Sequence, residues 1–125
     1  MNDELLFTKE HEWIKVEGNI AYIGITHFAQ SELGDIIFIE LPAVDEAFSS
    51  NDVFGTIEAV KTVADLFMPI ESKILEINSE VEGLPELINK DAQGKGWIVK
   101  VEIQDLDEVE KLLSLDDYKK IISNE

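Results

Sequence analysis

Short runs of apolar and β-branched residues, set close together along the chain, constrain its fold more than any other feature. They occupy residues 13–16, 20–25, 35–41, 53–60, 63–68, 74–77 and 97–103, and runs of this length favour β-strands. The first two flank the turn sequence Glu17-Gly18-Asn19, which predicts a hairpin. The near-continuous apolar run at 35–41 predicts a buried strand that ends at Pro42. Together the runs predict a compact, mainly β domain.

Helices are expected to be short. Thr26 is a suitable N-cap for a helix over residues 27–33, which Gly34 would end. Phe28 and Ala29 of this helix are expected to face the core. A further helical turn is expected at residues 84–89, where Pro85 lies near its start.

The C-terminal segment, about residues 107–123, is expected to be helical. Asp107 can cap a first helix that runs through Leu113. Ser114 with Asp117 resembles a capping box for a second helix. An apolar stripe at helical spacing on that helix is interpreted as packing, and it consists of Tyr118, Ile121 and Ile122.

Composition suits one domain over residues 1–125 and excludes several classes of function. The chain has no cysteine, which excludes zinc–thiolate sites, iron–sulfur clusters and thiol nucleophiles. Ten basic residues, all lysine, stand against 27 acidic ones, so the net charge is −17. Nucleic acid and anionic membranes repel such a chain. The acidic surface keeps the protein soluble, and it would also steer docking onto basic partners.

The expected location is the cytoplasm. No apolar run approaches the roughly 20 residues that span a bilayer. The N-terminal residues Met1–Leu5 lack the basic and apolar regions of a secretory signal. A mature mitochondrial matrix protein whose leader has been removed is the less favoured alternative.

Conventional catalysis finds little support in the sequence. His11-Glu12-Trp13 does not extend to the zinc-binding H-E-x-x-H pattern, because Lys15 stands at its last position. His11 and His27 are therefore interpreted as surface or capping groups. The chain has no G-x-S-x-G motif, and its carboxylates are too numerous to single out a pair. We expect a non-catalytic protein.

Lys61 differs from the other lysines because it lies between two strand-like runs, at residues 53–60 and 63–68. The chain must turn near residues 59–62 to bring these runs together. Yet Ala59-Val60-Lys61-Thr62 contains none of the usual turn residues. A conflict of this kind between local preference and global fold is expected at functional sites.

Several motifs, in order along almost the whole chain, resemble the glycine cleavage system H protein family. Glu58-Ala59-Val60-Lys61-Thr62 is similar to the family's lipoylation motif, E-[SA]-V-K-[AST]. Further matches are Lys9-Glu10-His11-Glu12-Trp13, Gly24-Ile25-Thr26-His27-Phe28-Ala29-Gln30, Leu33-Gly34-Asp35-Ile36, Glu40-Leu41-Pro42, the spaced set Asn78, Leu84, Pro85, Leu87 and Asn89, and Gly96-Trp97.

The chain departs from the family pattern in two places. Ser72 replaces a glycine in the turn that follows the lysine hairpin, so we expect a different or slightly strained turn there. Asp91-Ala92-Gln93 replaces the family's D-P-Y loop, which weakens any inference about loop contacts with partners.

The resemblance implies a barrel-sandwich hybrid, the flattened β-sandwich of lipoyl and biotinyl carriers, with a C-terminal helical segment. It implies lipoate attached covalently to Lys61 at an exposed hairpin tip. Glu58 would mark the site for the lipoyl-attaching enzyme, or it is simply a solvated carboxylate.

The implied partners are three further enzymes. A glycine decarboxylase would load an aminomethyl group, an aminomethyltransferase would remove it, and dihydrolipoamide dehydrogenase would reoxidise the arm. The resemblance implies no metal, and we expect a monomer.

Other functions are weighed beside this one. A lipoyl relay that donates lipoyl groups to other enzymes is the main alternative. A biotin carrier usually has methionine on both sides of its lysine, whereas the neighbours here are Val60 and Thr62. A lipoyl domain of a 2-oxo acid dehydrogenase usually reads D-K-A. A stand-alone enzyme and a purely structural adaptor complete the set.

Overall fold

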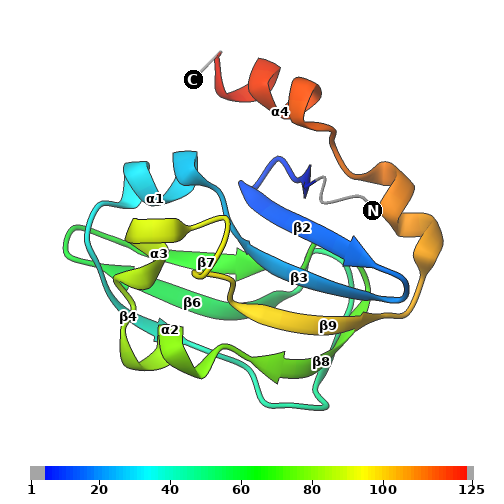
Figure 1. The fold of residues 1–125 in the computed structure, drawn as a ribbon, viewed down its shortest axis with the longest axis horizontal. Helices are drawn as coiled ribbons and strands as arrows, with labels where there is room; N and C mark the ends of the chain where they lie inside the picture. Colours follow the sequence, from blue (N-terminus) through cyan, green and yellow to red (C-terminus); the bar gives the residue numbers. More distant parts are fainter. Residues whose placement is uncertain (1–4, 124–125) are drawn as a thin grey trace.

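In the computed structural model, which describes residues 5–123, the chain forms two antiparallel sheets with short helices around them (Figure 1). The larger sheet has six strands in the order β1-β2-β3-β9-β8-β5, and the smaller has three in the order β4-β6-β7. The mainly β architecture expected from the sequence is confirmed.

The larger sheet is built around the hairpin of β2 and β3. Its strands are β1 (Leu6–Phe7), β2 (Glu12–Glu17), β3 (Ile20–Ile25), β9 (Val99–Ile103), β8 (Ser72–Ile77) and β5 (Ala47–Phe48). Gly18 lies in the predicted turn with φ of 65°, a left-handed conformation that favours glycine. The predicted hairpin is therefore confirmed.

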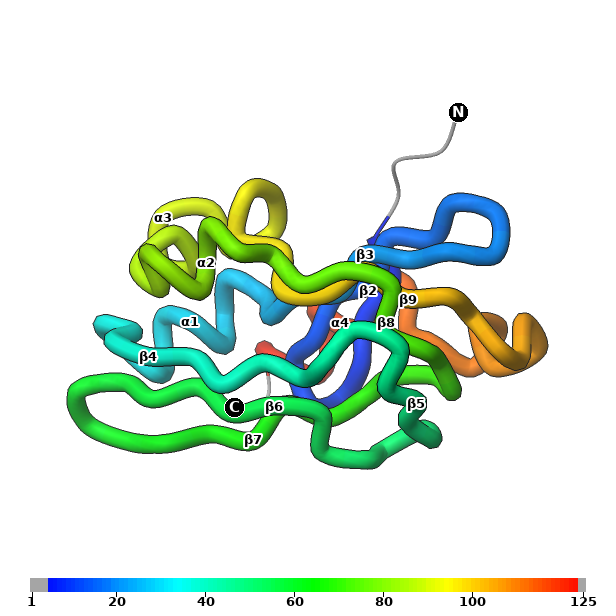
Figure 2. The backbone as a smooth tube through the Cα atoms, turned by 90° about the horizontal axis from the view of Figure 1, so that it is seen from below, coloured from blue at the N-terminus to red at the C-terminus, as the bar shows by residue number. Residues whose placement is uncertain are grey.

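The smaller sheet forms a separate layer. It contains β4 (Ile36–Glu40), β6 (Val53–Ala59) and β7 (Val63–Phe67). Figure 2 shows the β6–β7 hairpin below β3 and β9, with its tip at the end of the molecule that holds α1, α2 and α3.

The core fills the space between the two sheets. Both layers supply fully buried side chains to it, among them Ile23 and Val101 from the larger sheet and Ile57 from the smaller. Burial of such large aliphatic side chains stabilises a fold by about 1.5–3 kcal/mol each. The core therefore holds the β6–β7 hairpin against the rest of the protein.

The prediction that residues 35–41 form a buried strand is wrong in part. Ile36 and Ile39 are buried, but Ile37 and Phe38 are more than half exposed. β4 lies at the edge of the smaller sheet, and its register with β6 shifts between Ile36 and Phe38. The outer face of the smaller sheet is open to solvent, and the register shift lets two consecutive residues lie on it, so an apolar run does not guarantee burial.

Two of the helices cover the end of the molecule near the β6–β7 tip. α1 spans His27–Leu33, as predicted, and the Thr26 hydroxyl accepts a hydrogen bond from the Ala29 amide at 3.2 Å. Ala29 packs against the core, whereas Phe28 lies against the His11 ring, with 4.9 Å between ring centroids. The helical turn expected at 84–89 lies slightly later, as α3 (Leu87–Asp91).

Helix α2 (Ser79–Gly83) was not predicted from the sequence. Asn78 caps it by accepting a hydrogen bond from the Glu80 amide. The Asn78 amide group also donates to the Trp97 carbonyl at 2.7 Å, so a contact distant in sequence supports this short helix.

The C-terminal segment is helical, but its first cap differs from the prediction. A 3₁₀-helix, η1, spans Leu106–Lys111, and its cap is Asp105, whose carboxylate accepts from the Asp107 amide. The predicted cap Asp107 lies inside this helix. α4 spans Leu115–Ile122, and the Ser114 hydroxyl accepts from the Asp117 amide as predicted.

Ser72 does not cause the strained turn that the sequence predicted. It is the first residue of β8, pairs with Ile103, and is fully buried. Its hydroxyl donates to the Ile70 carbonyl at 2.8 Å, which satisfies the buried polar group locally. Among residues 5–123, the non-glycine residues with positive φ are His11, Asp45 and Asn51.

No helix within residues 5–123 is long and apolar enough to cross a bilayer. The expectation about Met1–Glu4 lies outside the described residues.

Candidate functional site

Lys61 lies at the tip of the β6–β7 hairpin and is exposed. The hairpin register pairs Glu58 with Val63 and Ile57 with Ala64, so the chain reverses over the residues between Ala59 and Val63. The turn required by the sequence therefore occurs at the predicted position. Figures 1 and 2 both place this tip at the edge of the molecule, opposite η1.

The rest of the fold holds the turn, as its unusual sequence requires. The Ala59 amide donates to the Thr62 carbonyl at 2.8 Å, which closes the tip. The Val60 amide donates to the Asp35 carbonyl at 3.0 Å, which ties the tip to the segment before β4. No tip residue has a positive φ, so the left-handed turns common in tight hairpins are not used. The tip is thus fixed without glycine or asparagine.

Gly55 explains how β6 approaches β4 so closely. A Cβ atom at this position would lie 2.5 Å from the Glu40 carbonyl oxygen, a distance that real Cβ atoms do not adopt. The register of β6 with β7 also shifts between Val53 and Gly55. Glycine at this position lets the three strands pack together and carry the tip.

Glu58 lies on the outer face of the smaller sheet. It is exposed, and it pairs with Phe38 on β4 and with Val63 on β7. This position three residues before Lys61 suits recognition by a modifying enzyme. It also suits a solvated carboxylate, and the geometry leaves both interpretations open.

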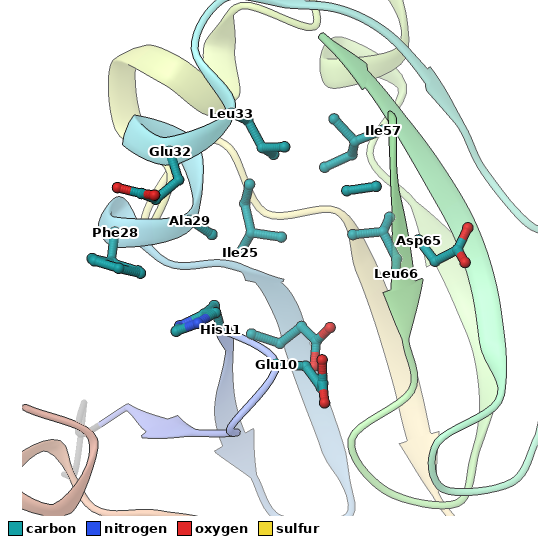
Figure 3. Close-up of a pocket in the computed structure, with 12 residues that line it drawn as sticks. Glu10, His11, Ile25, Phe28, Ala29, Glu32, Leu33, Ile57, Asp65 and Leu66 are labelled. Carbon is teal, nitrogen blue, oxygen red and sulfur yellow. The ribbon is translucent and has the colours of Figure 1, made fainter. Parts of the chain in front are cut away.

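A cavity of about 290 Å³ lies on the inner side of the hairpin (Figure 3). Residues from α1, from the start of β2, from β3 and from the hairpin line it: Glu10, His11, Glu12, Ile25, Phe28, Ala29, Glu32, Leu33, Ile57, Ala64, Asp65 and Leu66. Its walls combine apolar side chains with carboxyl groups, and no lysine lines it. The cavity can therefore hold an apolar chain that ends in a cation.

Glu12 is the buried carboxyl group at this cavity, and the sequence did not predict its role. It is 2% exposed, accepts from the Thr8 hydroxyl at 2.8 Å and accepts from the Phe67 amide at 3.2 Å. Burial raises the pKa of Glu12 from 4.5 to about 8, because the charged form loses its hydration. The alternation of β2 could have indicated this position, since Glu12 shares a face with the fully buried Ile14.

The two histidines have different surroundings. His27 is exposed at the start of α1, as expected. His11 is half-buried and lines the cavity, and its Nδ1 atom forms a hydrogen bond with the Tyr118 hydroxyl at 2.8 Å. Its backbone φ is 70°. His11 thus belongs to the wall of the cavity rather than to the open surface.

Known proteins resemble this chain over nearly its whole length. A family model described as "Glycine cleavage H-protein" matches residues 5–125. A glycine cleavage system H protein from Carboxydothermus hydrogenoformans is 52% identical over 122 residues, which cover 98% of this chain and 94% of that protein. The crystal structure of a glycine cleavage system H protein from Mycobacterium marinum matches with a TM-score of 0.88 at 32% identity, covering 98% and 99% of the two chains. The expected barrel-sandwich hybrid is confirmed.

Proposed function

The chain belongs to the glycine cleavage H-protein family, and on this premise we propose that Lys61 carries its lipoyl group. Members of the family carry lipoyl-lysine, and this protein is the non-catalytic lipoyl carrier of the glycine cleavage system. The observation that carries the proposal is the position of Lys61, exposed at a braced hairpin tip within the motif Glu58–Thr62.

Attachment requires Lys61 to act as a nucleophile. The neutral Nζ atom attacks the carbonyl carbon of an activated lipoyl acyl adenylate, AMP leaves with the bonding electron pair, and the nitrogen releases a proton as the amide forms. The exposed tip gives an enzyme access to Nζ. Glu58, exposed on the neighbouring strand, is proposed to help that enzyme recognise the tip.

The lipoyl group supplies a redox-active disulfide that accepts a one-carbon unit bearing an amine. The protein supplies placement. Ile25 and Leu66 offer apolar walls in the cavity, and the exposed carboxyl groups of Glu10 and Glu32 would favour a protonated amine. This cavity is also lined by Ile57 and Ala64. These two residues form the strand pair next to Glu58 and Val63, close to the tip that carries Lys61. The cavity therefore offers the free end of the arm a place away from water.

As a component of the glycine cleavage system, the protein is proposed to visit glycine decarboxylase, aminomethyltransferase and dihydrolipoamide dehydrogenase in turn. Its net charge of −17 suits transient docking onto basic surfaces and disfavours nucleic acid and anionic membranes. We further propose that residues 1–125 act as one monomeric carrier domain in the cytoplasm. Neither the tip nor the cavity favours the lipoyl-relay alternative.

Intact mass and peptide mapping test the assignment of Lys61. Protein isolated from a lipoate-replete host is expected to carry one lipoyl adduct, on the peptide that contains Lys61. Lys61→Arg should abolish the adduct, because the guanidinium group is not a nucleophile at neutral pH. Lys73→Arg is the matched control and should keep it, since Lys73 lies on β8 in the other sheet. An adduct on another lysine, or biotin on Lys61, contradicts the proposal.

A further inference from the structure

Four large apolar side chains are exposed around the tip of the hairpin. Ile37 and Phe38 of β4 are 56% and 55% exposed, Val60 of the tip is 68% exposed, and Val63 of β7 is 58% exposed. We call these residues the tip patch. Single exposed apolar residues are common on soluble proteins and need no explanation, but a group around one functional lysine does.

The strand register places Phe38 and Val63 of the tip patch on either side of Glu58. Phe38 pairs with Glu58, and Glu58 pairs with Val63, so these side chains form one row across the outer face of the smaller sheet. Directly opposed residues in an antiparallel sheet have Cβ atoms about 4.5–5.5 Å apart. The Val60 amide is bonded to the Asp35 carbonyl, which holds Val60 near the start of β4. By contrast, exposed Leu84 and Leu106 lie on separate parts of the chain.

Apart from Lys61 itself, the charges around the tip patch are negative. Glu40, Glu58 and Asp65 are exposed on β4, β6 and β7. Within these strands and the tip between them, the only basic residue is Lys61, which loses its charge on acylation. A partner that covers this face must therefore combine an apolar surface with a basic rim.

The position of the tip patch distinguishes among partners. An enzyme that acylates Lys61 must bring its activated acyl group to the Nζ atom itself, so it must contact the tip. An enzyme that acts on the far end of the finished arm has no such requirement. We propose that the tip patch is the docking surface of the enzyme that acylates Lys61, which meets it with an apolar face rimmed by lysine and arginine. This inference rests on the proposed function of Lys61.

The test measures acylation of the unmodified protein by an ATP-dependent lipoate ligase, with lipoate and ATP, followed by intact mass. The double variant Ile37→Ser, Phe38→Ser is expected to lower kcat/KM about tenfold or more, mainly through KM, because buried apolar contacts commonly dominate such interfaces. Leu106→Ser removes an equally exposed apolar side chain, 55% exposed, far from the tip. This control should stay within about twofold of the unsubstituted protein.

A pair of charge variants tests the basic rim and does not depend on the double variant being folded. Phe38→Lys should be acylated at least about threefold more slowly than Phe38→Glu, because only the lysine repels a basic partner. Three results would contradict the docking surface while leaving the proposed lipoylation of Lys61 intact. The two charge variants are acylated at equal rates, the double variant keeps the unsubstituted rate, or Leu106→Ser loses as much activity as the double variant. If the unsubstituted protein gains no lipoyl group on Lys61, the proposed function itself fails.

Discussion

At the residue scale, the burial of Glu12 makes the stability of the protein depend on pH. Its pKa is about 8 in the folded protein, against 4.5 ordinarily. At any pH between these two pKa values, Glu12 keeps a proton in the folded protein that it has released in the unfolded chain. The free energy of unfolding must therefore fall as pH rises through this window, by up to about 1.4 kcal/mol per pH unit from this group.

Glu12→Gln removes the titration while keeping the shape of the side chain. Near pH 5 the variant should be less stable than the unsubstituted protein. The difference should shrink toward pH 8, because only the unsubstituted protein loses stability through titration of Glu12 as pH rises. Urea unfolding at several pH values measures the difference. Glu40→Gln controls for the loss of one carboxyl from the exposed surface. A Glu12→Gln difference that is constant from pH 5 to 8 would show that Glu12 is ionised throughout.

At the element scale, Tyr118 connects helix α4 to the wall of the cavity. The Tyr118 ring stacks on Phe7 with 4.7 Å between centroids. Its hydroxyl bonds to His11 Nδ1 at 2.8 Å and to Thr26 Oγ1 at 2.7 Å. Thr26 caps α1 and His11 lines the cavity, so the C-terminal helix and the two elements beside the site share a single buried hydroxyl.

Tyr118→Phe keeps the stacked ring and removes only this hydroxyl. It should lower the free energy of unfolding by about 1–2 kcal/mol, the cost of breaking hydrogen bonds to buried polar groups. Tyr118→Ala should cost about 3–5 kcal/mol, because the ring packing is also lost. Tyr22→Phe is the control, since the contacts described for Tyr22 involve its ring. Equal effects of Tyr118→Phe and Tyr22→Phe on urea unfolding would contradict this account.

The sequence predicted the elements that depend on neighbouring residues. It did not predict burial or exposure where these depend on contacts between segments distant in sequence. The β2–β3 hairpin and the Thr26 and Ser114 caps follow from neighbouring residues, and each was predicted. The exposure of Phe38 depends on the register shift between β4 and β6, which no local pattern reveals. The burial of Glu12 likewise depends on the Phe67 amide, 55 residues away.

The candidate site shows the same division between what the sequence predicted and what it did not. The turn at Lys61 was predicted because two strand-like runs require one. The hydrogen bond from the Val60 amide to the Asp35 carbonyl could not be predicted, because it joins segments that are distant in sequence. The cavity could not be predicted either, since α1, β2, β3 and the hairpin each supply part of its wall.

At the scale of the whole molecule, a net charge of −17 on 125 residues should oppose folding through self-repulsion. Salt bridges offset little of it, because those among the described residues, such as Lys15–Glu17 at 3.6 Å and Lys73–Asp45 at 3.9 Å, lie on the surface. Raising the ionic strength from about 0.01 M to about 0.15 M shortens the Debye length from about 30 Å to about 8 Å. This screens repulsion between distant carboxylates in the compact state more than in the expanded chain. The thermal midpoint should therefore rise by several degrees over this range of sodium chloride, which calorimetry at pH 7 can measure. The control is potassium chloride at equal ionic strength. It should give the same rise in the thermal midpoint, because screening depends on ionic charge and not on ion identity. A midpoint that stays constant or falls would mean that the acidic side chains are spaced widely enough to fold without mutual cost, and the same field would then be too weak to steer docking.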